Sequence, residues 1–412
     1  RKGDFVLLSI QQSIYDWPAI WKVPLDETAM KASKLVQRQI DGVWDWYADD
    51  AGTVREGLEF TPTSVKVHYR KNESEMFRVI ATLTRKNWND KIWDVERIVS
   101  GSDEGYAITK EIDGTSILAR FNYVTRTVGE TIYSSQGGTI EDVYYDANDK
   151  PMAVTYSDDH GHVEWLDPKM KRLQTAMATA LSGTGVTMTS RTDDGSKMLV
   201  WSGDEGDPGA LYLFDTQSRH LDLLGEQRQD LQPRMLAKPV AIDYKARDGV
   251  KIHAYLTLPK GRPAKNLPLV ILPHGGPYGV RDMLVYDDEV QFLANRGYVV
   301  LQPNYRGSSG YGEGFEGLGD GQIGRTMQDD LDDGMDDLAK QGIIDPKRVC
   351  IVGSSYGGYA AVWGVIRNPE RYRCAASFAG VMNWKRQLRY QNSQESEGSE
   401  RKKWSLRVKG GT

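Results

Sequence analysis

One short motif has the residue types and spacing of a serine nucleophile. In Gly353-Ser-Ser-Tyr-Gly-Gly358 the serines follow an apolar run that ends at Val352, and a segment with a helical pattern comes next. Glycines on both sides permit a sharp turn from strand to helix without Cβ clashes. The middle serine, Ser355, would then extend above the sheet at the positive end of the helix. Because a serine in this position can attack a carbonyl carbon, the motif predicts acyl-transfer chemistry.

A second glycine-rich segment could complete an oxyanion hole beside this serine. Pro273-His-Gly-Gly-Pro277 follows a predicted strand that ends at Leu272, and the loop with one of the two oxyanion donors is expected there. We expect the backbone N–H of Tyr356 to be one donor and the backbone N–H of Gly275 or Gly276 to be the other.

The histidine of this segment, His274, could act as the general base or could position the oxyanion hole. In an enzyme with a strand–serine–helix turn the triad histidine follows the serine in the chain, so we interpret His274 as a residue of the oxyanion hole. Every histidine of this chain precedes Ser355: His68, His160, His162, His220, His253 and His274. A serine hydroxyl without a base is a poor nucleophile at neutral pH, so we expect this chain by itself to be close to inert.

From about residue 236 onward, predicted strands and helices alternate. Residues 240–258 contain two alternating patterns joined at Asp248-Gly249, which is a strong hairpin signal. Short apolar runs are typical of buried parallel strands. They occur at 269–272, 298–301, 348–352 and 373–379, and helical patterns occur at 285–296, at 329–341 and before Pro369. This order predicts a mostly parallel sheet covered on both faces by helices.

The first 235 residues instead contain short, aromatic-rich segments with high β propensity, separated by turn signals. The segments are at 44–46, 93–95, 163–167 and 211–215, and the turns are at 49–52, 112–114, 148–151 and 193–195. Trp44 and Trp93 are 49 positions apart, as are Trp165 and Phe214, and Asn148 and Asp193 are 45 apart. A strand-built repeat of about 40–50 residues favours a β-propeller. A β-sandwich or a run of hairpins is the alternative.

Several ordered motifs give the chain a resemblance to a known family. They are Ala254-Tyr-Leu-Thr-Leu-Pro259, His274-Gly-Gly-Pro277, Asn304-Tyr-Arg-Gly-Ser-Ser-Gly-Tyr-Gly312, Met327-Gln-Asp-Asp330 and Gly353-Ser-Ser-Tyr-Gly-Gly358. Between about Val240 and Trp384 the sequence resembles the prolyl oligopeptidase family, and most closely its acylaminoacyl-peptidase and dipeptidyl-aminopeptidase-like branch. The resemblance implies an α/β-hydrolase domain capped by a β-propeller that screens substrates by size. It also implies peptide substrates, a Ser-Asp-His triad with Ser355 as the serine, and an oxyanion hole with Tyr356 and the His274-Gly275-Gly276 loop.

The chain departs from the family pattern, because the acid and the histidine of the triad are expected well beyond the serine. Only 57 residues follow Ser355, and from about Leu388 the sequence stops resembling the family. About 235 residues allow five or six blades, whereas the resemblance implies about seven or eight. We therefore expect a partial β-propeller at 1–235, an incomplete α/β-hydrolase domain at 236–387 and an atypical polar tail at 388–412. A truncated copy explains this better than a complete but degenerate protein.

Composition excludes several classes of protein. Lys and Arg number 52 against 57 Asp and Glu, which gives a net charge of −5 that does not favour nucleic acid binding. A mean hydropathy of −0.54 without a long apolar run predicts a soluble protein with no membrane span. Two cysteines, Cys350 and Cys374, are too few for a disulfide scaffold or a four-thiolate zinc site. We interpret both as small apolar residues on buried strands.

Three further patterns do not indicate a cofactor or a metal. Gly312-Glu-Gly-Phe-Glu-Gly317 has the glycine spacing of a dinucleotide motif but does not directly follow a strand. The aspartates between 329 and 337 lack the spacing of a calcium loop, and we expect them on the solvated face of a helix. His160-Gly-His162, next to Asp158-Asp159, is interpreted as a turn rather than a zinc site. We therefore expect no cofactor and no metal.

The leading hypothesis is a serine peptidase that hydrolyses short peptides or N-terminal (acyl)aminoacyl bonds through an acyl-enzyme. A carboxylesterase is an alternative, because a serine elbow and an oxyanion hole do not choose between esters and amides. A catalytically inert propeller fragment that only binds partners is another, since the triad acid and base are missing. The sequence leaves open the preferred side chain, exo- or endopeptidase action, the oligomeric state, and a cytoplasmic, periplasmic or secreted location.

Overall fold

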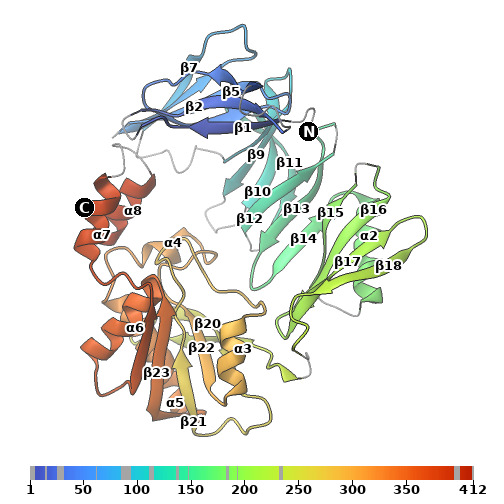
Figure 1. The fold of residues 1–412 in the computed structure, drawn as a ribbon. Helices are drawn as coiled ribbons and strands as arrows, with labels where there is room; N and C mark the ends of the chain where they lie inside the picture. The colour runs from blue at the N-terminus through green and yellow to red at the C-terminus, as the bar shows by residue number, and fades with distance from the viewer. Residues whose placement is uncertain are drawn as a thin grey trace. The chain divides into compact units, whose positions relative to one another are not determined.

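The computed structural model (Figure 1) describes residues 5–13, 16–25, 32–61, 63–84, 94–110, 116–135, 139–146, 148–181, 185–192, 194–231, 235–393 and 400–410. The chain separates into two compact units. The first comprises Arg1–Tyr156 with Lys385–Leu406, and the second comprises Ser157–Trp384 with Arg407–Thr412. The domain boundaries expected at residues 235 and 387 remain predictions. Within the described ranges, no helix is long and apolar enough to cross a membrane.

Up to residue 226, the described part of the chain forms sheets of consecutive strands and one helix between two of these sheets. In β6 (Ser64–Tyr69), for example, Val65 and Val67 are fully buried and the residues before each of them are partly exposed, as the period of two in a strand requires. The sheets consist of β1 (Phe5–Ile10), β2 (Ala19–Pro24) and β3 (Lys34–Gln37); β4 (Val43–Ala48), β5 (Val54–Phe60), β6 and β7 (Arg78–Thr84); β8 (Asp94–Ile98), β9 (Glu104–Lys110), β10 (Ser116–Asn122) and β11 (Thr127–Ser134); β12 (Thr139–Tyr145), β13 (Pro151–Ser157) and β14 (Gly161–Trp165); and β15 (Gly185–Arg191), β16 (Lys197–Asp204), β17 (Asp207–Asp215) and β18 (His220–Glu226).

Each predicted repeat of about 40–50 residues corresponds to one sheet. Four sheets begin at Val43, Asp94, Thr139 and Gly185, which are 51, 45 and 46 positions apart. Trp44 lies in β4, near the start of its sheet. Trp165 and Phe214 are wrong as a repeat pair, because Trp165 is in the last strand of one sheet and Phe214 is in the third strand of another. Trp93, the predicted turn at 112–114 and Asp193 lie outside the described residues.

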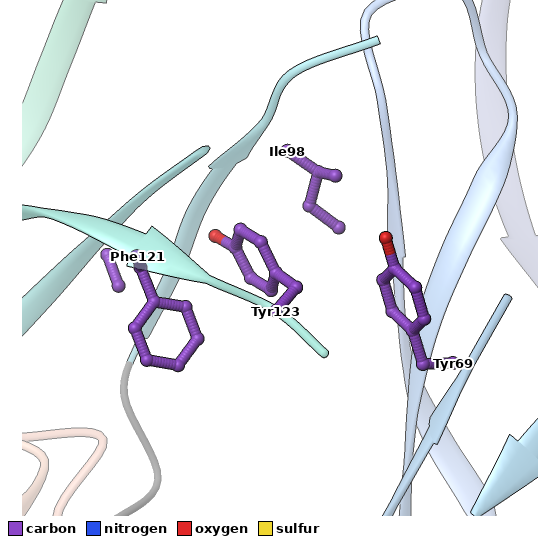
Figure 2. Packing of buried hydrophobic residues seen from close by; sticks show 5 residues of the cluster. Tyr69, Ile98, Phe121 and Tyr123 are labelled. Carbon is purple, nitrogen blue, oxygen red and sulfur yellow. The ribbon is translucent and has the colours of Figure 1, made fainter. Parts of the chain in front are cut away.

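The first unit has a buried aromatic cluster between two of its sheets. Tyr69 of β6 packs with Ile98 of β8, Phe121 of β10 and Tyr123 just beyond β10 (Figure 2). Each of these side chains is at most 1% exposed. The Tyr123 hydroxyl donates a hydrogen bond to the Tyr106 carbonyl oxygen, which satisfies the polar end of a ring that is otherwise buried. The sheet with β6 and the sheet with β8 and β10 therefore bury apolar side chains against each other.

A helix that the sequence analysis did not predict, α2 (Pro168–Ala180), lies between β14 and β15. Asp167 caps this helix, because its carboxylate accepts a hydrogen bond of 2.8 Å from the Met170 N–H. Pro168 occupies the first helical turn, where its missing N–H costs nothing. The Asp-Pro pair is a signal for a helix start, and the prediction of a strand at 163–167 is wrong at Asp167, which caps the helix.

The second unit contains a six-stranded mixed sheet in the order β19-β20-β22-β21-β23-β24. Its strands are β19 (Val240–Lys245), β20 (Lys251–Thr257), β21 (Leu267–Ile271), β22 (Val299–Asn304), β23 (Ile344–Ser354) and β24 (Cys374–Phe378). β19 and β20 form the predicted hairpin, and β20 pairs antiparallel with β22. The remaining pairings are parallel, so the prediction of a mostly parallel sheet is confirmed.

Helices connect the strands of this sheet and continue beyond it. They are α3 (Asp288–Asn295), α4 (Glu313–Gly317), α5 (Thr326–Lys340), α6 (Tyr356–Arg367), α7 (Trp384–Ser393) and α8 (Glu400–Lys409). α3 buries Val290 against Leu272 and Val300 of the sheet region. The segment expected to be an atypical polar tail, 388–412, is helical at 388–393 in α7 and at 400–409 in α8.

The aspartates of α5 correct one expectation. We expected a solvated face, but Asp330 and Asp332 are fully buried and Asp333 is nearly so. Each has a polar partner far along the chain: Asp330 accepts from Arg306, Asp332 from Tyr372 and Asp333 from Arg247. A buried carboxylate requires such partners to offset its lost hydration.

The two cysteines correct another expectation. Cys350 and Cys374 lie directly opposite each other on the parallel strands β23 and β24, and they form a disulfide. Cys374 is exposed and Cys350 is partly exposed. The interpretation of both as buried apolar residues is therefore wrong.

Candidate active site

β23 turns directly into α6 at Ser355. This residue has φ of 55° and ψ of −119°, a combination that an L-residue keeps only where the surrounding structure enforces it. Its side chain is exposed, and α6 begins at the next residue. The strand, sharp turn and helix that the motif predicts are therefore present.

Glycines of the motif occupy positions where a side chain does not fit. A Cβ on Gly353 would lie 2.5 Å from the carbonyl carbon of Gly357, and one on Gly358 would lie 2.6 Å from Ser377 Oγ. A Cβ on Gly357 would collide with the carbonyl oxygen of Pro273. The first turn of α6 thus lies directly against the backbone of the loop after β21, and only glycine permits this approach.

Backbone hydrogen bonds hold the turn from both sides. The Ser355 N–H donates to the Phe378 carbonyl over 2.9 Å, and the Val381 N–H donates to the Ser355 carbonyl over 3.3 Å. The Tyr359 N–H donates to the same carbonyl over 3.1 Å, which starts the helical bonding of α6. Because both peptide groups of Ser355 are bound, the direction of its side chain is set by the backbone.

The predicted oxyanion donors lie beside this serine. Tyr356 is the first residue of α6, so its N–H has no partner within the helix and lies at the positive end of the helix dipole. A Cβ built on Gly275 would lie 3.6 Å from the Ser355 Cβ. Gly276 follows with φ of +126°, which glycine adopts without strain. The fold brings these residues together, and their roles in catalysis remain predictions.

His274 is buried next to this site and binds the surrounding loops. Its Nδ1 is 2.6 Å from the Gly275 carbonyl oxygen, and its Nε2 is 2.9 Å from Ser308 Oγ. The Tyr305 ring stacks on the imidazole with ring centroids 4.3 Å apart. Burial lowers the pKa of His274 to about 4, so the ring is neutral at pH 7. With both ring nitrogens occupied by loop atoms, His274 is suited to positioning Gly275 and not to taking a proton from the serine.

Polar side chains fix the loop after β22, which carries the Ser308 partner of His274. Arg306 binds Asp330 through Nη2 and Oδ1 at 2.7 Å, and Asp248 through Nη1 and Oδ2 at 2.7 Å. Asn304 accepts a hydrogen bond of 2.8 Å from the Asp282 N–H and returns one of 3.1 Å to its carbonyl. The motifs at 304–312 and 327–330 therefore hold this loop in place, a role that we did not assign from the sequence.

The remaining histidines of the second unit have other surroundings. His162 binds Asp158, His220 binds Asp222, His253 binds Asp243 and Asp159, and His160 lies in the turn between β13 and β14. Among the residues that the structure describes, no three His, Cys, Asp or Glu side chains are grouped so that they could hold a metal ion. The expectation of no metal or cofactor remains a prediction.

The part of the chain that contains Ser355 is similar to known proteins. The prolyl oligopeptidase family matches residues 285–404. The chain is similar to this family over these residues, which include Ser355. Because the match extends past Leu388, the expectation that the resemblance stops there is wrong. The family comprises serine peptidases that hydrolyse peptides.

Curated relatives of the chain are named as peptidases. Dipeptidyl aminopeptidase BIII of Pseudoxanthomonas mexicana is 35% identical over 257 residues, which cover 60% of this chain and 36% of that protein. Dipeptidyl peptidase family member 6 of Caenorhabditis elegans is 27% identical over 377 residues, which cover 82% of this chain and 49% of that protein. The chain therefore spans half or less of the length of these relatives.

Solved structures of two peptidases share the fold of this chain. A puromycin-hydrolyzing peptidase of Mycobacterium tuberculosis has a TM-score of 0.69 at 18% identity and covers 99% of this chain, which spans 65% of that one. Prolyl oligopeptidase B from Galerina marginata has a TM-score of 0.68 at 14% identity, with 99% of this chain and 57% of that chain covered. The predicted fold class, β-propeller sheets followed by an α/β-hydrolase sheet, is confirmed.

Proposed function

We propose that the protein containing this chain is a serine peptidase in which Ser355 is the nucleophile. The observation that carries the proposal is the strained, exposed conformation of Ser355 between β23 and α6. A serine held in this way has its hydroxyl presented to substrate, and the N-terminus of α6 favours negative charge beside it. Similarity to the prolyl oligopeptidase family over residues 285–404 supports the same chemistry.

In the proposed reaction Ser355 Oγ attacks the carbonyl carbon of the scissile bond. The charge that develops on the carbonyl oxygen is stabilised by the N–H of Tyr356 and that of Gly275 or Gly276. A base takes the Oγ proton and delivers it to the leaving amine as the C–N bond breaks, which leaves an ester on Ser355. Water then hydrolyses this ester, so that the acid product leaves and the hydroxyl is restored.

The base is the component that this sequence does not offer. No histidine follows Ser355, and His274 is neutral and occupied by its loop partners. We therefore expect the 412-residue chain by itself to react slowly. We propose that the base and the acid that orients it are residues outside this sequence.

We infer that the substrates are short peptides or peptides with an acylated N-terminal residue. The support is the naming of relatives as dipeptidyl aminopeptidases and, in Oryza sativa and Sus scrofa, as acylamino-acid-releasing enzymes. The β-propeller sheets would limit substrate size. An oxyanion hole also accepts esters, so small esters should be cleaved as well.

The test is covalent labelling of the natural gene product with a fluorophosphonate, which reacts with activated serines. We expect labelling at Ser355, its loss in Ser355→Ala, and its retention in Ser354→Ala. Ser354 is the matched control, because it is adjacent and exposed but precedes the turn. Peptide hydrolysis should fall by roughly 10⁴-fold or more in Ser355→Ala.

Labelling that persists in Ser355→Ala would remove this serine as the nucleophile. Equal turnover of esters and of peptide amides, without dependence on peptide length, would instead favour a carboxylesterase. Measuring kcat/KM for a series of peptides of increasing length and for one short-chain ester separates these outcomes.

A further inference from the structure

Arg281 carries a positive charge on the loop after β21, a few residues beyond the predicted oxyanion donors. Its side chain is partly exposed. Among the described residues its side chain makes one hydrogen bond, from Nη2 to the Met283 sulfur over 3.9 Å, and no ion pair. A thioether is a weak acceptor. Arg306 on the neighbouring loop, by contrast, binds both Asp330 and Asp248. The Arg281 guanidinium therefore has no counter-ion in the described part of the chain.

The guanidinium is nevertheless held against the loop after β22. A Cβ built on Gly310 would lie 2.5 Å from its Nη1, so a glycine leaves the space that it occupies. Its Cζ is 5.7 Å from the centroid of the Tyr311 ring, a distance at which the ring face attracts a cation. The Ser309 N–H donates to the Val280 carbonyl over 3.1 Å, which connects the two loops next to Arg281. A cation held in this way loses less conformational freedom on binding an anion than a free surface arginine does.

Two acidic residues in the neighbourhood leave this charge uncompensated. Asp282 follows Arg281 in the chain, and burial raises its pKa to about 7, so that it is partly protonated at neutral pH. Asp159, whose charge acts on Tyr311 together with that of Arg281, accepts a hydrogen bond of 2.7 Å from the Tyr255 hydroxyl. Neither carboxyl group forms an ion pair with Arg281.

The two loops that hold Arg281 also border the candidate nucleophile. A Cβ built on Gly275 would lie 3.6 Å from the Ser355 Cβ, and one on Gly276 would lie 3.6 Å from the Val280 Cβ. Arg281 is the residue after Val280, so it directly follows a side chain that packs against the predicted oxyanion loop. We expect a peptide whose scissile bond lies at Ser355 to extend past this guanidinium.

We propose that Arg281 is a specificity-determining residue that binds a carboxylate of the substrate. The carboxylate is either the C-terminal group of a short peptide or the side chain of an Asp or Glu residue. A guanidinium suits such a group, because its planar fork donates two parallel hydrogen bonds to the two carboxylate oxygens. The proposal rests on the proposed function, since it takes Ser355 as the position of the scissile bond.

Three substitutions test this role. Arg281→Met removes the charge and the donors but keeps an unbranched apolar side chain. Arg281→Lys keeps the charge and loses the planar fork. Arg262→Met is the matched control, because Arg262 is an exposed arginine of the same unit whose guanidinium lies beside Gly297 instead of the two loops.

The first readout is kcat/KM of the natural gene product for two sets of peptides. One set consists of alanine peptides of increasing length, each with either a free C-terminal carboxylate or a C-terminal amide. The other set has C-terminal amides throughout and carries Glu or Gln at one position at a time. The first set reports on the terminal carboxylate and the second on an acidic side chain.

The wild type and Arg262→Met should prefer the carboxylate member of at least one pair by about tenfold, as expected for hydrogen bonds between charged groups. Arg281→Lys should keep part of this preference. Arg281→Met should lose it, with kcat/KM for the uncharged peptides unchanged. The same preference in the wild type and in Arg281→Met, or no preference in the wild type, would overturn the proposal.

The second readout is calorimetric binding of the same peptides to Ser355→Ala protein, which cannot form an acyl-enzyme, with and without Arg281→Met. The affinity difference between carboxylate and amide peptides should depend on Arg281 and decrease with added salt. If it does so but fluorophosphonate does not label Ser355 in the wild type, the peptidase function fails and the carboxylate site stands. If labelling is normal and neither kcat/KM nor affinity depends on Arg281, the specificity proposal fails alone.

Discussion

Ser355 and His274 lie close together in the chain's candidate active site, and their surroundings suit opposite tasks. The Ser355 side chain is exposed on a strained backbone. His274 is buried, stacked on Tyr305 and bonded through both ring nitrogens. A base must be able to gain a proton during the reaction, and burial makes the charged form of this imidazole unfavourable. His274 is therefore a structural group whose removal should affect stability in a defined pH range.

We predict that His274 makes the fold sensitive to acid. Its pKa is lowered by burial to about 4 in the folded chain, whereas an unfolded histidine titrates near 6.5. Between these values the unfolded chain binds a proton that the folded chain does not, so stability falls as the pH drops from about 6.5 to 4. Between these pH values the free energy of unfolding of the wild type should fall by up to about 3 kcal/mol relative to that of His274→Gln, whose side chain does not titrate. Urea unfolding of both proteins at several pH values measures this, and identical pH profiles would contradict it.

At the scale of elements, the sharp turn at Ser355 between β23 and α6 depends on how closely α6 approaches the loop after β21. Gly357 brings the first turn of the helix against the Pro273 carbonyl. A Cβ built on Gly275 of the same loop would lie 3.6 Å from the Ser355 Cβ, so the packing of α6 and the proposed oxyanion hole involve the same loop. A side chain added at this point should disturb both.

We predict that Gly357→Ala destabilises the second unit by about 1–3 kcal/mol, because the new methyl group collides with backbone that cannot move freely. Fluorophosphonate labelling at Ser355 should fall at the same time. Gly314→Ala in α4 is the control, since its Cβ would have no neighbour within 4 Å. Thermal unfolding and labelling rates of the two variants give the comparison, and an unaffected Gly357→Ala protein would show that the helix can shift away.

At the scale of the whole molecule, arginines connect the consecutive sheets of the first unit. Arg55 of β5 donates to the Ser102 carbonyl beside β9, and Arg97 of β8 binds Asp149 beyond β12. Arg126, after β10, binds Glu56 of β5, which is fully buried. Because each arginine spans two sheets, the sheets should unfold together and not one at a time.

We predict that Glu56 lowers the stability of this unit at alkaline pH. Burial raises the pKa of Glu56 to about 7, against the opposing effect of Arg126. A group with a raised pKa stabilises the fold below its unfolded value of about 4.5, and this contribution is lost as the pH rises through about 7. Between pH 4.5 and 8, the free energy of unfolding of the wild type should fall by up to about 3 kcal/mol relative to that of Glu56→Gln.

Glu59→Gln is the control, because we expect Glu59 to change stability with pH in the opposite direction. Burial alone would raise the pKa of Glu59, but hydrogen bonds from Lys66 and His68 hold it below its ordinary value. Its contribution is therefore present above about pH 4.5 and lost in acid. Equal pH profiles for the wild type and Glu56→Gln in denaturant titrations would contradict the assignment to Glu56.

Local signals explain which features the sequence predicts. The elbow at Ser355, the hairpin at Asp248-Gly249 and the parallel strands follow from glycines and apolar runs within a few residues. The burial of Asp330 and the bond between Cys350 and Cys374 depend on which strands become neighbours, and no local pattern contains that information. α2 is an intermediate case. Asp167 and Pro168 are a local signal for the start of a helix, but the preceding residues had favoured a strand.

The disulfide has a consequence for chain connectivity. Cys350 and Cys374, 24 positions apart, close a covalent ring that contains Ser355 and all of α6. A single backbone cut within this ring cannot separate the two halves of the polypeptide. The nucleophile of a nicked molecule would thus stay attached to both halves until a reductant opens the ring.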